Sequence, residues 1–385
     1  MTDSKSKLSS TPMADSASGT DTDANETMRL AITRFRNKMA AANQKFLQDR
    51  INEIEAKGLA TEEEKRCQLR QYLWMDHLAW DDEEPETHRH DRIQIPQQTS
   101  VSALDIPAIL NALPSHEPAD GVLPPLLRTE QWRQMYVDTV QRVCQRQADA
   151  IVASDGEACN SHKDHRPMSI PRCDELALFL QYAQGVVDVD FRLLGIAPFT
   201  PAWSIGVKEE ELEGLDEGQR RVKLADPELL RRGQEGLQRE LEDEVSNAWL
   251  EASTDEDLDV RAGFITGVGY NRLHECPEWY TAYVYCRLLT DDDGEQDEDI
   301  QDAANIRHWG WRVVVFKAEV VGPSVLYGRK ARFDSIPEFL DWYASWLDHL
   351  DARGLLSLRR HAVGCETDCE SDCEDHATGI YAEDC

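Results

Sequence analysis

Two runs in the carboxy-terminal half most restrict the fold that this chain can adopt. They are WYTAYVYCRLL, at 279–289, and WRVVVFKAEVV, at 311–321. Both runs carry aromatic and β-branched residues at odd and even positions alike, which is typical of strands covered on both faces. Gly322 and Pro323 then turn the chain into the short runs SVLYG and KARF. We therefore predict a strand meander in which 279–289 lies at the centre of a sheet.

Helical patterns accompany these strands. Asp174 is a predicted N-cap of a short helix that Gly185 ends, and the apolar runs 186–191 and 193–196 are predicted short strands. A long helix is predicted over 226–250, because Asp226 supplies an N-cap and proline follows at the first helical position.

A closing helix completes the half. Ser335 and Glu338 form an S-x-x-E capping box, and the apolar residues that follow recur at helical spacing up to about Gly354. Together with the meander, these helices predict an α+β domain with an antiparallel sheet in the carboxy-terminal half.

The amino-terminal half carries helical periodicity instead. A T-x-x-E capping box at Thr61 predicts one helix start, and further helices are predicted near 106–113 and 130–152. The preceding helix has a seam of apolar residues spaced three and four apart: Met28, Ile32, Phe35, Met39, Ala42 and Phe46. We predict a helical region over 26–153.

Three segments lack the apolar residues that a core requires. Residues 1–25 are rich in Ser, Thr, Asp and Ala and are predicted to be disordered. Residues 154–166 are predicted to be a polar linker, and 355–385 an acidic, cysteine-containing disordered tail.

Charge limits the partners that such a chain can bind. It has 73 acidic against 41 basic residues, a formal net charge of −32. A field of this sign repels phosphate backbones and anionic lipids and attracts basic surfaces. We therefore expect protein partners with basic patches and no nucleic acid.

Location is predicted from two further features. The first residues, MTDSKSKLSS, lack the apolar run of a secretory signal, and no window holds 18 uncharged apolar residues. We expect a cytoplasmic or nuclear protein, in which cysteines are thiols or metal ligands rather than disulfides.

Cysteines recur in the tail, within CETDCESDCEDH at 365–376. On one helix the first and third thiols would be about 12 Å apart, too far for a single zinc ion. In an irregular chain Cys365, Cys369 and Cys373 can converge with His376, so zinc and redox roles stay open beside the preferred acidic tail. An acid follows three residues after Thr367 and after Ser371, which makes both candidate phosphorylation sites.

A second group of metal-ligand residues lies in the linker and shortly after it. Cys159, His162, His165 and Cys173 could supply a tetrahedral Cys2His2 site, although no second closely spaced pair supports it. This group is the basis of an alternative function, a zinc-binding protein or a hydrolase.

No catalytic motif stands out elsewhere. GVGYNR, at 267–272, has two glycines of a dinucleotide fingerprint but arginine in the third place. The H-E-x-x-H, G-x-S-x-G and Walker motifs do not occur in the sequence. We therefore expect neither an enzyme nor a cofactor.

The helix that starts near Met28 is a basic island on an acidic chain. We take Arg34, Phe35, Arg36 and Lys38 as candidate interaction residues for a partner's groove. The alternatives are packing onto the Thr61 helix and docking on the protein's own acidic surface. Trp342 and Trp346, on the flank of the closing helix, are candidate interaction residues too.

The carboxy-terminal half also resembles a known family. The order PRCDELALFLQYAQG, short strands, WRVVVFKAEVVGPSVLYGRKARF and DSIPEFLDWYASWLDHL is similar to the SUKH superfamily, which includes yeast cell-wall assembly regulators and bacterial toxin-immunity proteins. The resemblance covers about 167–352, with an insertion at 208–261. The comparable positions are mostly core residues: Leu178, Phe179, Leu180, Gly185, Phe333, Phe339, Leu340 and Trp346.

What this resemblance implies is an α+β domain that acts by binding protein, without a catalytic motif. The sequence as a whole thus predicts a non-enzymatic regulatory or adaptor protein that recruits basic partners through an acidic surface.

Overall fold

A computed structural model of the 385-residue chain describes thirteen stretches. They are residues 18–73, 99–111, 118–125, 129–154, 168–187, 199–201, 217–242, 258–271, 276–288, 301–302, 308–317, 325–326 and 329–345. Helices and antiparallel strands are both present, so the predicted α+β fold class is confirmed.

A four-stranded antiparallel sheet lies at the centre, in the order β3-β4-β6-β9. Its strands are β3 (Leu258–Asn271), β4 (Cys276–Leu288), β6 (Gly310–Lys317) and β9 (Arg332–Phe333). β4 pairs with β3 on one side and β6 on the other, which confirms its predicted central position. The predicted strand 311–321 is described to Lys317.

The edge strand β3 was not predicted. Three register shifts against β4 break its alternation, and one of them frees the backbone of Thr266, whose carbonyl oxygen accepts from Thr200 N at 2.7 Å. Gln147 covers another stretch of this edge, because its amide bonds both the N–H and the carbonyl of Gly263 at 3.1 Å. Residues 267–271 of GVGYNR belong to this strand and do not form a phosphate loop. Arg272 lies outside the described residues.

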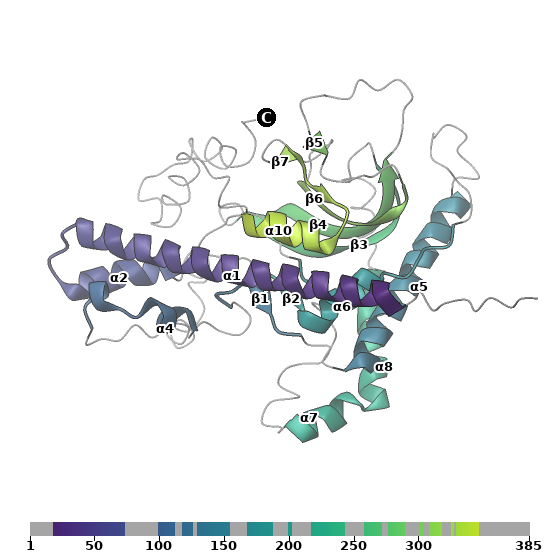
Figure 1. Ribbon diagram of the computed structural model, residues 1–385, viewed down its shortest axis with the longest axis horizontal. Helices are drawn as coiled ribbons and strands as arrows, with labels where there is room; N and C mark the ends of the chain where they lie inside the picture. Colours follow the sequence, from purple (N-terminus) through teal and green to yellow (C-terminus); the bar gives the residue numbers. More distant parts are fainter. Residues whose placement is uncertain are drawn as a thin grey trace, which may run out of the picture.

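Helices cover one face of the sheet. α10 (Ile336–Ser345) lies between the sheet and the long helix α1 (Ser18–Ala56), and α6 (Asp174–Tyr182) lies beside them (Figure 1). Their apolar residues form one core, from Met28 to Ala344, with those of α5 (Glu130–Ser154) and α8 (Pro227–Leu241). The predicted helical region and the predicted α+β domain therefore share a core.

The capping box of α10 forms as predicted on one side, since Ser335 Oγ accepts from Glu338 N at 3.2 Å. Two details of α6 are corrected. Cys173, not Asp174, occupies the N-cap position, and the helix ends at Tyr182. Gly185 lies in a strand instead, where a Cβ would meet Phe199 O at 2.9 Å.

α1 begins earlier than predicted. Residues 18–25, which we expected to be disordered, are helical, and Asn25 accepts a hydrogen bond of 2.7 Å from the Tyr182 hydroxyl. This contact to α6 is distant in sequence, which is why composition did not reveal it. Residues 1–17 lie outside the described part. The helix ends before Gly58, which has φ +62 as expected for a C-terminal glycine.

A small helical lobe surrounds the far end of α1 (Figure 1). It consists of α2 (Glu62–Leu73), the 3-10 turn η1 (Val101–Ala103) and α4 (Ile106–Asn111). Thr61 and Glu64 exchange both hydrogen bonds of the predicted capping box, at 3.0 and 3.1 Å. The lobe has a core of its own: Leu47, Ile51, Ile54, Leu69, Val101, Ile106, Ile109 and Leu110.

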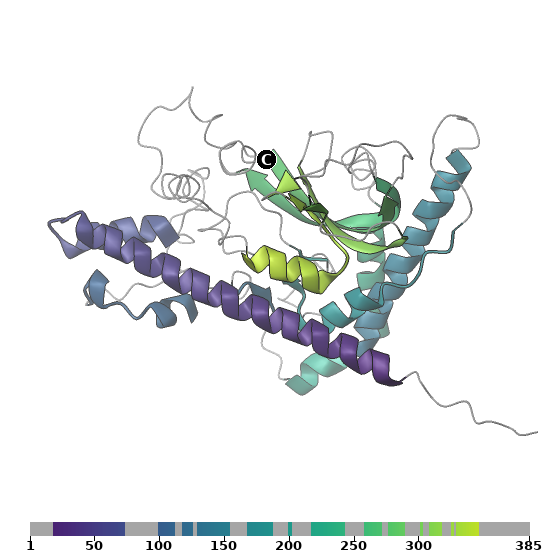
Figure 2. The same cartoon turned by 45° about the horizontal axis from the view of Figure 1, so that its top comes forward.

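At the other end, α5 (Glu130–Ser154) packs against α8 (Pro227–Leu241), with α7 (Glu217–Leu224) before it (Figure 2). Asp226 caps α8 as predicted, since its side chain accepts from Glu228 N at 3.0 Å. α7 was not predicted, because its sequence EGQRRVKL is mostly charged.

Two small sheets complete the fold. β1 (Val122–Leu123) pairs with β2 (Gly185–Val186), and the order β5-β8-β7 joins Gln301–Asp302, Arg329–Lys330 and Val325–Leu326. The predicted meander is thus divided, since only β9 continues the central sheet. The predicted linker after Ser154, residues 193–196 and the tail lie outside the described residues.

Candidate functional site

The basic face of α1 is occupied by acids of the same chain. Arg34 forms a bidentate pair with Asp341 of α10, at 3.0 and 2.7 Å, and Arg36 Nε lies 2.9 Å from Asp120 Oδ2. Lys38 is part-buried and also takes part in an interaction. Of the alternatives left open by the sequence, the structure shows two. Arg34 and Arg36 dock on the protein's own acidic residues, and the later part of α1 packs on α2, the helix that starts after Thr61.

Two of the candidate interaction residues are buried, which corrects the expectation that they are accessible. Phe35 is fully buried, with its ring 5.8 Å from that of Tyr343. Trp342 is 4% exposed and its ring lies 4.9 Å from that of Phe333. Phe35 belongs to the apolar seam of α1, and that seam predicts its burial, whereas Trp342 was predicted to lie on the flank of its helix. Trp346 lies outside the described residues.

The proposed thiol site is represented in the described part by Cys173 alone. Its side chain is 1% exposed, and burial raises the pKa of the thiol to about 12. At neutral pH it is therefore a neutral core residue rather than a thiolate ligand. Cys159, His162 and His165 lie outside the described residues, as do all the tail candidates: Cys365, Cys369, Cys373, His376, Thr367 and Ser371. Within the thirteen described stretches, no three His, Cys, Asp or Glu side chains group as a metal site.

The described part also contains a polar stripe on α5 that sequence reasoning missed. Gln134, Asp138, Gln141 and Gln145 recur at helical spacing along one side of the helix. Gln145 accepts from Ile170 N at 2.9 Å and donates to Met168 O at 3.0 Å, while Gln141 donates to Ile170 O at 3.0 Å. The stripe therefore binds the backbone of the segment 168–172.

This segment runs antiparallel to α5. Met168 is bound at Gln145, whereas Arg172 is bound at Asp138, seven residues earlier on the helix. That separation is about 10 Å along the axis, which the four steps from one residue to the next between Met168 and Arg172 can span only in an extended conformation. Trp311 Nε1 donates to Pro171 O at 2.9 Å from the opposite side.

The side chains of the segment are recognised as well as its backbone. Ile170 is fully buried in the core. The guanidinium of Arg172 contacts Asp138 Oδ1 at 3.2 Å, Gln134 Oε1 at 2.8 Å and Asp174 Oδ1 at 3.1 Å. The end of the stripe near Asp138 is thus built to hold a basic side chain.

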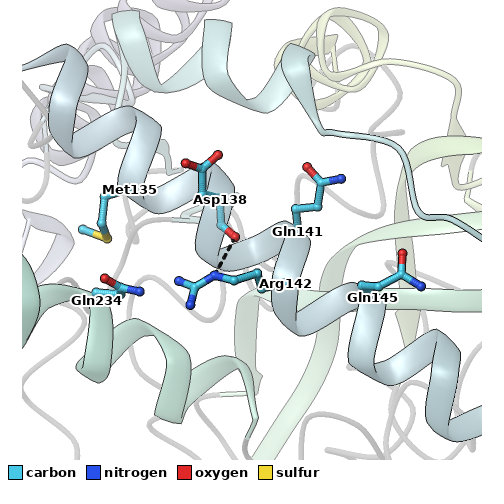
Figure 3. A pocket seen from close by; sticks show the side chains of 6 residues that line it. All are labelled: Met135, Asp138, Gln141, Arg142, Gln145 and Gln234. Atoms are coloured by element: carbon cyan, nitrogen blue, oxygen red, sulfur yellow. Dashed lines mark hydrogen bonds between the residues drawn. The ribbon is translucent and has the colours of Figure 1, made fainter.

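A hollow of about 630 Å³ opens beside this stripe, between α5 and α8. Its lining residues are Met135, Asp138, Gln141, Arg142, Gln145 and Gln234. Figure 3 shows Asp138 and Gln141 projecting from one side of α5, with Arg142 next to Gln234. Arg142 donates to Asp138 O at 3.2 Å and to Thr139 Oγ1 at 3.0 Å. The amide orientation that satisfies Gln234 turns its oxygen towards Arg142, which donates to it.

A cluster of charges is buried at the end of the sheet. Asp259 and Arg261 are each 1% exposed, and Asp259 Oδ1 lies 3.3 Å from Arg261 Nε. Arg287 adds a contact of 3.4 Å to Asp259 and lies over the Trp309 ring at 4.8 Å. These residues pair with one another across β3 and β4, which is a structural arrangement rather than an open site.

Glu175 joins α6 to α10. Its carboxylate accepts from Ile336 N, an amide of the first turn of α10, at 3.1 Å. Burial raises the pKa of this carboxyl to about 7, and the bond to Ile336 N works against that rise. The carboxyl group therefore titrates near neutral pH. Its role is structural, because it accepts a hydrogen bond from an amide at the start of α10.

No helix in the described stretches is long and apolar enough to cross a membrane. Comparisons of the chain with family models, with curated proteins and with solved structures each found no match.

Proposed function

We propose that this protein is a non-enzymatic regulatory or adaptor protein of the cytoplasm or nucleus, which recruits basic protein partners through its acidic surface. The observation that carries the proposal is the internal pairing of its cations. On α1, Arg34 and Arg36 are held by Asp341 and Asp120, while the whole chain keeps a formal net charge of −32.

Electrostatic attraction of this kind acts at long range and sets association rate and partner choice more than final affinity. Recruitment of a partner by electrostatic attraction does not require a cleft in which catalytic groups converge. In the described part, the thiols of Cys144 and Cys173 have raised pKa values because they are buried. Both therefore fit a packing role better than a nucleophilic one.

We also propose a relationship to the SUKH superfamily for 167–352. Its support is the element order: α6 comes first, the antiparallel sheet follows, and α10 closes the domain after a capping box. Binding of protein partners is what the resemblance implies, which agrees with the charge argument.

Affinity capture from cell extract tests the proposal. We expect the captured proteins to carry basic patches, and we expect their recovery to fall as salt is raised. A parallel capture with residues 361–385 removed measures the contribution of the tail. Recovery of mainly acidic partners, or recovery indifferent to salt, would contradict the proposal.

The alternative, a zinc protein or hydrolase, is tested by elemental analysis of the purified full-length chain. We expect no stoichiometric zinc, because Cys173 is buried as a neutral thiol. One zinc ion per chain would favour the alternative.

A further inference from the structure

We propose that the hollow between α5 and α8 binds a lysine- or arginine-bearing segment of a partner protein, with Asp138 and Gln141 as acceptors of the basic head group. This inference rests on the proposed function and deepens it, because it assigns the recognition of basic partners to one place on the surface.

The first step is the unused hydrogen-bonding capacity of the lining. Asp138 Oδ1 accepts from Gln134 at 2.8 Å and from Arg172 at 3.2 Å, whereas Oδ2 accepts from no group in the described part. Gln141 donates to Ile170 O and its Oε1 is unused among the described contacts. Two acceptors on one helix face, one of them charged, suit a cationic donor.

The second step is the precedent within the chain. Arg172 shows that a guanidinium fits against this end of α5, with contacts to Asp138, Gln134 and Asp174. Asp138 remains 49% exposed in its side chain, so a second cation can approach Oδ2 from the hollow.

The third step is the orientation of the bound segment. Met135 is part-buried and packs on the core, so it offers an apolar floor for the aliphatic stem of lysine or arginine. Arg142 lies at the α8 side, where it donates to the Gln234 amide oxygen and repels a second cation. The head group therefore points to Asp138, and the rest of the peptide lies towards Gln234, at the α8 side of the hollow.

Size agrees with this occupant. A hollow of about 630 Å³ is larger than one side chain and accommodates a short stretch of peptide. The net charge of −32 favours the approach of a basic segment.

The test uses the full chain and a fluorescent hexa-arginine peptide, with fluorescence anisotropy at low salt. Asp138→Asn removes the charged acceptor, and Glu130→Gln is the matched control on the same helix, because it also removes one negative charge and its side chain is 79% exposed. We expect Asp138→Asn to weaken binding about tenfold and Glu130→Gln to change it by less than about twofold.

Arg172→Gln separates ligand contact from loosening of the segment 168–172. This variant keeps Asp138 and removes its internal partner, so we expect binding of hexa-arginine to be equal or tighter. Equal losses in Asp138→Asn and Arg172→Gln would overturn the assignment, since both then act through the segment.

A second pair of variants leaves α5 intact in case Asp138→Asn does not fold. Gln234→Arg places a positive charge in the hollow from α8, and Gln238→Arg places it one turn further along the same helix. We expect only the first to weaken binding. Equal effects of the two, or equal effects of Asp138→Asn and Glu130→Gln, would overturn the site and leave the acidic-surface proposal standing. No binding by the unmodified protein would contradict both.

Discussion

At the scale of the residue, Glu175 links the stability of the fold to pH. Its carboxyl has a pKa of about 7 in the folded protein against 4.5 ordinarily, because the folded protein buries it. Below about 4.5 the group is protonated in both states, and its contribution to stability is then fully present. As pH rises through 7 the folded protein must bury a charge, so this contribution is lost.

Glu175→Gln should remove that dependence. The amide stays neutral and its oxygen can still accept from Ile336 N, so we expect the variant to have a higher Tm than the unmodified protein above pH 7. The difference should vanish near pH 4.5. Thermal melts across this range measure it, with Glu130→Gln as the exposed control. A Tm difference that grows towards low pH would contradict the conclusion that burial raises the pKa of Glu175.

Phe35 tests whether the α1 seam is core or interface. Because its ring is fully buried against Tyr343, Phe35→Ala should lower the free energy of unfolding by about 3–5 kcal/mol. Leu30→Ala, on the same helix but 41% exposed, should cost less than about 1 kcal/mol. Denaturant unfolding provides both values.

If Phe35 were an interaction residue instead, Phe35→Ala would leave unfolding unchanged and reduce partner capture. Two similar unfolding costs for the variants would likewise argue against the seam as core.

At the scale of the element, two glycines with positive φ have different surroundings. One follows the end of α1, and the other precedes β1. Gly58, with φ +62, has no atom within 4 Å of an added Cβ. Gly121, with φ +68, precedes β1, and an added Cβ would lie 2.6 Å from Val187 O and 3.0 Å from Phe35 Cε1. Only the second is crowded as well as left-handed.

Gly58→Ala should therefore cost about 1 kcal/mol, the strain of the left-handed conformation. Gly121→Ala should cost about 3 kcal/mol or more, because the β1–β2 pair and α1 must shift. Chemical denaturation of both variants decides the comparison. Equal losses of unfolding free energy would mean that the turn before β1 rearranges around the added methyl group at little cost.

Sequence predicted elements whose evidence is local. β4 and β6 have long aromatic and β-branched runs, and the capping boxes at Thr61 and Ser335 place two helix starts. β3 was missed because its glycines and bulges interrupt the alternation, and α7 because its charges hide any apolar face.

Contacts between distant segments could not be predicted. Arg34 and Asp341 are 307 positions apart. From the sequence alone, the basic helix therefore resembles a free surface, because no local pattern indicates that α10 packs against it. The polar stripe on α5 was missed for the same reason. Its glutamines bind the backbone of the segment 168–172, and no local pattern in the sequence indicates that this segment lies beside α5. The helical spacing of the apolar residues around Phe35 predicts that its side chain is buried, as the structure shows. The interaction hypothesis did not use this spacing.

At the scale of the whole molecule, apolar residues from both halves build one core, and a separate small core holds the helical lobe on α1. Internal ion pairs use the cations of α1, while the chain as a whole retains its large negative charge. The fold provides a scaffold, and we propose that recognition belongs to the acidic surface.

The salt dependence of binding tests this account most directly. The dissociation constant for hexa-arginine should be measured over a series of salt concentrations, with hexa-glutamate as the control of opposite charge. The account predicts binding of hexa-arginine alone, with an affinity that falls steadily as salt screens the attraction. Binding of hexa-glutamate, or an affinity for hexa-arginine that does not change with salt, would contradict it.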